Sequence, residues 1–275
     1  MSLRRLDVTG LLRQHGLTPK KGLGQNFLLD ESALREIVEL AEIPAGAEVL
    51  EVGAGLGNLT RYLALAAERV VAVELDKGLL PVLREVVKDT PQVEIVQGDI
   101  LELNPAELMR QEGFLVVANI PYYITSALIR HLLEANLKPS RMVLTVQREV
   151  AERICAKPGE MSLLALSVQV YGKAKVAGRI PAGAFFPAPA VDSSVVRIDL
   201  YDEPAIPADR LEDFFSLIRA GFGQRRKTLR NSLAAGMGWT TEQAAALLAQ
   251  AGIDPKRRAE TISMEEWGRI VRSKE

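Results

Sequence analysis

Two kinds of hydrophobic spacing alternate along the chain between Glu48 and about Gln147. Short runs rich in β-branched residues predict strands, and apolar residues three and four positions apart predict the helices between them. The expected strands are Glu48–Val52, Arg69–Glu74, Val93–Gln97, Phe114–Ala118 and Arg141–Val146, and the expected helices are Leu59–Ala67, Leu79–Lys88 and Ser126–Ala135. Continuous apolar strands separated by helices are typical of a parallel sheet covered on both faces, so we predict a doubly wound, mostly parallel α/β fold.

More segments extend this pattern on both sides. A helix is expected at Glu31–Ala41, with Asp30 at its start, and another at Arg148–Ala156. Lys173–Ile180 and Asp192–Leu200 have strand-like composition on either side of a proline-rich loop, and we expect them to add an antiparallel edge. In a sheet of this kind the ligand binds beyond the carboxyl ends of the strands.

The last quarter of the chain has only helical spacing. It follows a non-periodic stretch with two prolines, Tyr201–Ala208, which is typical of a linker. Helices are expected at Leu211–Phe222, Thr228–Ala235, Thr241–Gln250 and Met264–Val271. We therefore expect two domains, an α/β domain over residues 1–204 and a smaller all-α domain over residues 205–275.

Composition narrows the class of protein. The 275 residues are 48% hydrophobic, and 34 Lys and Arg against 35 Asp and Glu give a net charge of −1, so any nucleic-acid surface must be a local patch. The single cysteine, Cys155, excludes an internal disulfide and suits a reducing cytoplasm. With no long apolar run and no signal-like start, we expect a cytoplasmic protein with no membrane partner. His15 and His131 are isolated, so neither a metal site nor a catalytic triad is expected.

A glycine-rich loop follows the first expected strand, in the sequence Glu51-Val-Gly-Ala-Gly-Leu-Gly-Asn58. Gly53 and Gly55 would let the backbone approach a ligand at the start of a helix. The spacing is not that of dinucleotide-binding loops, and Glu51 would sit poorly beside a pyrophosphate. Both departures favour a ligand without phosphates, such as S-adenosylmethionine, while a tight turn with no ligand stays the alternative.

Acidic residues end the next two expected strands. Glu74 lies about twenty residues beyond the glycine loop, where a carboxylate commonly binds ribose hydroxyls. Asp99 follows the third strand and is placed to accept a hydrogen bond from the amine of an adenine. Each acid alone is equally typical of a helix cap or a solvated strand end.

The most informative motif is Asn119-Ile-Pro-Tyr-Tyr123, at the end of the fourth expected strand. The exocyclic amine of a nucleobase is a poor nucleophile because its lone pair is delocalised into the ring. The Asn119 amide oxygen and the Ile120 carbonyl would hold both amine hydrogens, with the nitrogen in line with an activated methyl group. Pro121 restricts Ile120 to an extended conformation, and Tyr122 would stack on the base. The alternative is an Asn cap beside buried tyrosines.

Five motifs in order carry a family resemblance: Gly24-Gln-Asn-Phe-Leu28, Glu51-Val-Gly-Ala-Gly55, Asn119-Ile-Pro-Tyr122, Phe185-Phe-Pro187 and Gly221-Phe-Gly-Gln-Arg-Arg-Lys-Thr-Leu229. With them the chain closely resembles the bacterial small-subunit rRNA adenine N6,N6-dimethyltransferases, whose loss gives kasugamycin resistance. The resemblance implies a Rossmann-like S-adenosylmethionine-dependent methyltransferase domain with a helical RNA-binding domain. It implies dimethylation of two adjacent adenines near the 3′ end of 16S rRNA.

The resemblance also assigns roles to single residues. It implies cofactor contacts at Asn26 and Leu28, with Gln25 nearby, at Gly53, Glu74 and Asp99, and at Asn119, which also contacts the target base. It implies that Phe186 is the second aromatic residue beside the adenine. From the residues alone, Phe27 is simply buried and Phe186 equally suits a core position.

The substrate interpretation rests on charge and base flipping. Unpaired loop adenines are the cheapest bases to extract, and Arg225, Arg226, Lys227 and Arg230 form a candidate phosphate-binding patch. We expect 16S rRNA, in the small subunit or its precursor, as the partner of a monomeric enzyme. The alternatives are a ribosome-assembly checkpoint that mainly binds, and the related large-subunit rRNA methylase that confers macrolide resistance. The segment Gly221–Leu233 favours the small-subunit interpretation.

Overall fold

A computed structural model describes residues 3–121, 124–224 and 226–274 of the chain. By internal packing the chain divides into two compact units. Unit 1 comprises the residues up to Ala151 together with Lys175–Leu200, and unit 2 comprises Glu152–Ala174 and the residues from Tyr201 onward. In the expected division the chain passes from the first domain to the second once, between residues 204 and 205. In the structure it passes between the units three times, after Ala151, after Ala174 and after Leu200. The reason is that helix α8 (Leu163–Gln169) contacts helix α9 (Leu211–Phe222).

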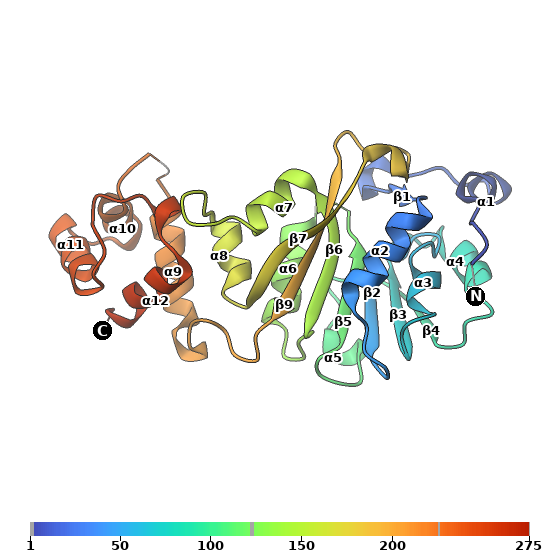
Figure 1. Ribbon diagram of the computed structural model, residues 1–275, viewed down its shortest axis with the longest axis horizontal. Coiled ribbons are helices and arrows are strands. Elements are labelled where there is room, and N and C mark those ends of the chain that lie inside the picture. The colour runs from blue at the N-terminus through green and yellow to red at the C-terminus, as the bar shows by residue number, and fades with distance from the viewer. Residues whose placement is uncertain (1–2, 122–123, 225, 275) are drawn as a thin grey trace. The chain divides into compact units, whose positions relative to one another are not determined.

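Unit 1 is built on a seven-stranded sheet (Figure 1). The order across the sheet is β4-β3-β2-β5-β6-β9-β7. The strands are β2 (Glu48–Val52), β3 (Arg69–Glu74), β4 (Val93–Gln97), β5 (Leu115–Asn119), β6 (Arg141–Gln147), β7 (Gly172–Ile180) and β9 (Ser193–Leu200). Strands β2 to β6 pair in parallel, and β9 runs antiparallel to β6. The predicted mostly parallel α/β sheet and the antiparallel addition of β9 are therefore confirmed.

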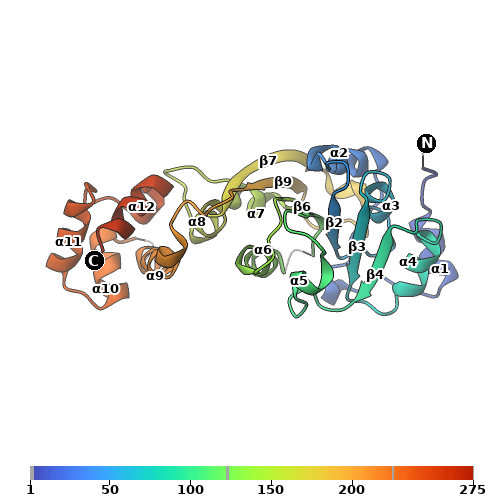
Figure 2. The ribbon, with the colours of Figure 1, turned by 90° about the horizontal axis from the view of Figure 1, so that it is seen from below.

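Helices cover both faces of the sheet, with α2 and α3 on one side and α5 and α6 on the other (Figure 2). The helices of unit 1 are α1 (Val8–Gln14), α2 (Glu31–Ala41), α3 (Thr60–Leu63), α4 (Leu80–Val86), α5 (Pro105–Leu108) and α6 (Thr125–Glu134), and α7 (Arg148–Ile154) continues into unit 2. The Asp30 side chain accepts a hydrogen bond from the Ala33 amide, as expected of a helix start. Helix α3 is shorter than predicted because the amides of Leu65 and Ala66 bond three residues back, which turns the chain out of the α-helical pattern.

The core of unit 1 lies between the sheet and its helices. Ile37 of α2 and Leu63 of α3 pack on strand residues such as Val49, Leu115 and Val143, all fully or nearly fully buried. Because both faces are covered, every residue of β2 is buried, including Glu48 and Glu51. This packing holds the strand ends in place. The strand order reverses between β2 and β5, and a crevice for a ligand is expected at such a point.

A small second sheet in unit 1 escapes prediction from sequence. Strand β1 (Phe27–Leu28) pairs antiparallel with β8 (Phe185–Phe186), so that Phe27 lies opposite Phe186. Each strand has two residues, too short for a periodic signal, and the partners are more than 150 positions apart. The pairing anchors the segment before α2 to the loop before β9.

Unit 2 is helical in its C-terminal part, as predicted. Its elements there are α9 (Leu211–Phe222), α10 (Leu229–Met237), α11 (Thr241–Gln250) and α12 (Met264–Arg272). Trp267 is fully buried, and a Cβ atom at Gly221 would come 2.7 Å from its ring. A Cβ atom at Gly236 of α10 would come 2.6 Å from Ala220 of α9, so the backbones of these two helices lie close together. Within the described residues, no helix is long and apolar enough to cross a membrane.

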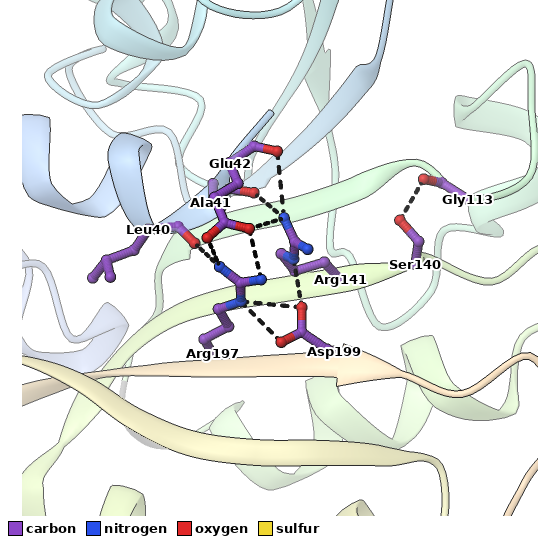
Figure 3. A network of polar contacts seen from close by, with 8 residues as sticks. All are labelled: Leu40, Ala41, Glu42, Gly113, Ser140, Arg141, Arg197 and Asp199. Carbon is purple, nitrogen blue, oxygen red and sulfur yellow. Dashed lines mark hydrogen bonds and ion pairs between the residues drawn. The ribbon is translucent and has the colours of Figure 1, made fainter. Parts of the chain in front are cut away.

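A paired charge network lies at the amino-terminal edge of the sheet (Figure 3). The Arg197 guanidinium donates to both carboxylate oxygens of Asp199, to Glu42 at 2.8 Å and to the Leu40 carbonyl at 3.0 Å. Arg141 donates to Asp199 at 2.5 Å and to the Ala41 carbonyl at 2.7 Å. The two arginines therefore bind the carbonyls that helix α2 leaves unpaired at its end. Together these contacts join α2 to β6 and β9.

Candidate active site

A cavity of about 400 Å³ opens at the carboxyl-terminal edge of the sheet in unit 1, where the strand order reverses. Its lining comes from segments far apart in sequence. These segments are the stretch before α2, the glycine-rich loop after β2, the ends of β3 and β5, and the turn after β4. The polar or backbone-exposing residues among them include Gln25, Asn26, Glu51, Gly53, Gly55, Glu74, Asp99 and Asn119. The structure thus brings the cofactor candidates of the sequence analysis, Leu28 included, around one cavity.

The glycine-rich loop lines the cavity with backbone. Gly53, Gly55 and Gly57 have φ values of 74°, 60° and 86°, which side-chain-bearing L-residues rarely adopt. The Gly53 amide donates to the carbonyl of Val73 at 2.9 Å, which pins the loop to the neighbouring strand. A Cβ at Gly55 would lie 3.2 Å from the Phe27 ring. These positions require glycine because of backbone conformation and, at Gly55, close packing.

Two buried carboxylates face this loop. Glu74 accepts hydrogen bonds from the amides of Gly55 and Asp76, both at 2.7 Å, and burial raises its pKa. Glu51 is 2% exposed, and its Oε2 atom has no hydrogen-bond partner within the described part of the chain. Burial, and after it the nearby Glu74 carboxylate, raise the pKa of Glu51 to about 8.

Such a pair of acids determines which ligands the cavity suits. A buried carboxyl oxygen without a partner costs free energy unless a ligand supplies a donor or a positive charge. A phosphate would instead bring negative charge against two carboxylates, so the cavity suits a cationic ligand without phosphates.

Asn119, the last residue of β5, is oriented by a segment 93 residues away. Its Nδ2 donates to the backbone carbonyl of Asn26 at 3.1 Å, and the Asn26 side chain donates to the Gly24 carbonyl at 3.2 Å. The Ile120 amide donates to the Thr145 carbonyl, and Ile120 and Pro121 both line the cavity. Tyr122 lies outside the described residues.

The β1–β8 pair flanks this region. Leu28 lines the cavity, and its carbonyl accepts a hydrogen bond from Asn58 at 2.8 Å. Phe186 is partly buried opposite Phe27, which lines the cavity, while Phe186 itself is not part of the lining.

Asp99 makes a capping contact and also lines the cavity. Its Oδ1 accepts a hydrogen bond from the Leu101 amide at 3.0 Å. The amide of Gly98 donates to the backbone carbonyl of Glu74 at 3.1 Å. This bond keeps the ends of β3 and β4 next to each other.

The candidate RNA-binding residues belong to unit 2. Arg226, Lys227 and Arg230 are exposed, and Arg225 lies outside the described residues. The amides of Leu229 and Arg230 donate to backbone carbonyls in the loop Pro255–Arg257. That contact brings this loop, with the exposed Lys256, next to the basic segment.

Sequence reasoning missed two charged residues that touch this site. Asp76 is buried in the turn after β3, and the Lys20 ammonium donates to it at 2.7 Å. They are 56 residues apart, and neither belongs to a motif with a local spacing. The signal that would have found Asp76 is its place two residues after Glu74.

Comparisons with known proteins show the family of the chain. The family described as "Ribosomal RNA adenine dimethylase" matches residues 16–275. "Ribosomal RNA small subunit methyltransferase A" of Dehalococcoides mccartyi strain CBDB1 is 47% identical over 261 residues, which cover 94% of this chain and 90% of that protein. The protein of the same name from Pelotomaculum thermopropionicum is 42% identical over 279 residues, covering 97% of this chain and 95% of that protein.

Solved structures give the same fold. A crystal structure of the 23S rRNA methyltransferase ErmE has a TM-score of 0.75 at 29% identity, covering 90% of this chain and 99% of that one. A dimethyladenosine transferase from Plasmodium falciparum has a TM-score of 0.76 at 22% identity, covering 89% and 95%, and supports the fold alone. From the sequence match over nearly its whole length, the chain belongs to the ribosomal RNA adenine dimethylase family.

Proposed function

We propose that this protein transfers methyl groups from S-adenosylmethionine to N6 of two adjacent adenines in 16S rRNA, giving N6,N6-dimethyladenosine during small-subunit biogenesis. The observation that carries the proposal is the cavity at the sheet's carboxyl edge, where buried acids without a cation lie beside an oriented asparagine. Curated relatives named for the small subunit support the choice of rRNA.

The residues around the cavity fit S-adenosylmethionine, which supplies an electrophilic methyl group on a cationic sulfur. Glu51 offers its unpartnered oxygen to the positively charged methionine end, near the backbone of Gly53 and Gly55. Glu74 accepts one backbone amide at each oxygen, which leaves further lone pairs for the ribose hydroxyls. We assign Asp99 to the adenine amine, and Asn26 and Leu28, with Gln25, to the enclosing segment.

Asn119 and its neighbours position the target base. Because the Asn119 amide nitrogen donates to the Asn26 carbonyl, the Asn119 amide oxygen is left to accept one hydrogen of the adenine amine. The carbonyl of Ile120 accepts the other, and Pro121 contributes no competing donor. Hydrogen bonds from both amine hydrogens to these acceptors localise the nitrogen lone pair for attack on the methyl group. The extra N–H proton then passes to water, so no strong general base is needed.

Aromatic and basic residues complete the assignment. Tyr122 stacks on the flipped adenine, and Phe186 supports the other side of it. The helical region 205–275 binds the RNA backbone through Arg225, Arg226, Lys227 and Arg230. The enzyme acts as a monomer in the cytoplasm on the small subunit or its precursor.

The test uses labelled S-adenosylmethionine with unmethylated small or large ribosomal subunits, followed by mass spectrometry of the rRNA. N6,N6-dimethyladenine near the 3′ end of 16S rRNA is the expected product. Label in large-subunit rRNA would instead assign the chain to the large-subunit methylases; the solved structures with the same fold include a 23S rRNA methyltransferase. Tight binding to small subunits without label would make assembly checking the main role.

A further inference from the structure

The cavity-lining segment begins in a closed loop, Lys20–Gln25, whose last three residues line the cavity. The Gln25 amide donates to the Lys20 carbonyl at 3.4 Å, and the Lys20 amide donates back to the Gln25 side-chain oxygen at 2.8 Å. Gly24 inside the loop has a φ of 62°, which closes the turn. Lys20 and Gln25 therefore present their side-chain donors from one compact loop.

Both donors bind the same buried carboxylate. The Lys20 ammonium donates to Asp76 Oδ1 at 2.7 Å, and the Gln25 amide donates to Oδ2 at 2.8 Å. Asp76 is only 6% exposed, and the Gly78 amide is a third donor to it at 3.0 Å. Burial alone would raise the pKa of Asp76, but these donors outweigh it and lower the pKa, so the carboxylate is charged at neutral pH.

This contact lies between the two parts of the cavity that the proposed function uses. On one side, the Asp76 amide donates to Glu74 Oε1, which orients the carboxylate assigned to the ribose. On the other side, Gln25 precedes Asn26, whose carbonyl orients Asn119. A displacement of the loop would therefore move the acceptor that holds Asn119 and loosen the turn that holds Glu74.

We propose that Lys20, Gln25 and Asp76 form a clasp, a set of positioning residues that fasten the cavity-lining segment to the turn after Glu74. The clasp preorganises the cofactor cavity without any of its charged groups touching the reacting atoms. A charge-assisted bond to a buried acid is stronger than an exposed ion pair, so the clasp is suited to this role. The inference rests on the proposed function, since it concerns the affinity for S-adenosylmethionine.

The first test compares Lys20→Met with Lys77→Met, using the full chain without RNA. Both changes remove an exposed lysine near Asp76, but of the two lysines only Lys20 bonds to its carboxylate within the described residues. Calorimetric titration with S-adenosylmethionine should give a Kd about five- to tenfold higher for Lys20→Met and an unchanged Kd for Lys77→Met. Lys20→Arg, which keeps a donor cation, should restore most of the affinity.

A second readout separates positioning from general stability. Hydrogen exchange of residues 21–28 in the free protein should be faster in Lys20→Met than in Lys77→Met, and bound S-adenosylmethionine should slow it in both. Affinity equal to wild type in Lys20→Met, or an equal loss in both lysine variants, would overturn the clasp. Failure of the wild-type protein to bind S-adenosylmethionine would instead count against the proposed function itself.

Discussion

The two edges of the same sheet differ in whether their acidic residues have a cationic partner. At the amino-terminal edge, Arg197 has Asp199 and Glu42 as ion-pair partners, and the pKa of each of these acids is lowered (Figure 3). At the carboxyl-terminal edge, Glu51 and Glu74 are more deeply buried and have raised pKa values, and within the described residues no cation pairs with either carboxylate, whereas Asp76 in the next turn pairs with Lys20.

This difference separates a structural role from a binding role. Paired charges close a helix end and join it to strands, so their contacts are complete within the chain. Buried acids without a cation lower stability, and such groups cluster where a ligand completes the site. The unpaired acids therefore support the proposal that the carboxyl-terminal edge is where the ligand binds.

The largest expected effect is the loss of methylation activity in Asn119→Ala, at the carboxyl-terminal edge of the sheet. Removing the amide acceptor should lower methylation of small subunits roughly 100- to 1,000-fold, because the target amine loses a contact that matters most during transfer. Binding of S-adenosylmethionine and of RNA should be largely retained. Turnover is measured by label incorporation into rRNA and binding by calorimetry, and normal turnover would disprove the assignment of Asn119.

At the amino-terminal edge, Arg197→Met should lower the free energy of unfolding by about 2 kcal/mol, since it leaves the Leu40 carbonyl without this donor, and Asp199 and Glu42 with Arg141 alone. Arg130→Met is the matched control, because Arg130 forms an exposed pair with Glu134 on α6 and should cost less than about 0.5 kcal/mol. Urea unfolding measures both. Equal losses in the two variants would remove the contrast between a buried network and a surface pair.

Glu51→Gln tests the unpaired acid directly. The change should leave the free energy of unfolding at pH 7 within about 0.5 kcal/mol, because a carboxyl with a pKa near 8 is already mostly neutral there. Affinity for S-adenosylmethionine at pH 8.5 should fall about tenfold, because a cationic ligand loses its counter-charge.

The pH dependence of this effect has a defined sign. In wild type, binding a cation requires Glu51 to release its proton, so affinity should rise by up to about tenfold per pH unit as pH approaches 8 and then level off. Because the ligand's own amine titrates too, the informative quantity is the ratio of wild-type to Glu51→Gln affinity from pH 6 to 9. A ratio that stays constant would show that Glu51 does not pair with the ligand.

The smallest effect concerns acid stability at the paired edge. Burial opposes ionisation of Asp199, but hydrogen bonds from Arg197 and Arg141 outweigh it and lower its pKa. Native Asp199 therefore stays charged where the unfolded chain binds a proton, and its contribution disappears as pH falls through the lowered pKa. Asp199→Asn should cost less than about 1 kcal/mol at pH 6 and still less at pH 3. Urea midpoints at the two pH values measure the gap, and a wider gap at pH 3 would contradict this sign.

Much of the fold could be predicted because the evidence for it is local. The boundaries of β2, β3 and β4 match the expected ranges, as do those of α9 and α11, since each element carries its own hydrophobic period. Helices α1 and α8 were not predicted as separate elements, because each has only seven residues and a short periodic signal.

The candidate site divides in the same way. The glycine-rich loop, Glu74, Asp99 and Asn119 follow strand ends, so the rule for parallel sheets places them at one edge. The contacts of Asn119 with Asn26 and of Lys20 with Asp76 span 93 and 56 residues, and no pattern in either segment encodes its partner.

By itself, the sequence determined the order of the main strands and helices, the edge of the sheet where the cavity lies and the family motifs. These depend on side-chain periodicity, on glycine's freedom at positive φ and on the identity of a few polar residues. The tertiary structure decided that Phe27 pairs with Phe186, that Lys20 binds Asp76, and that Glu51 Oε2 is buried without a hydrogen-bond partner among the described residues while Asp199 has two arginine donors. Burial and pairing of charges depend on which distant segments meet, and that is fixed only when the whole chain packs.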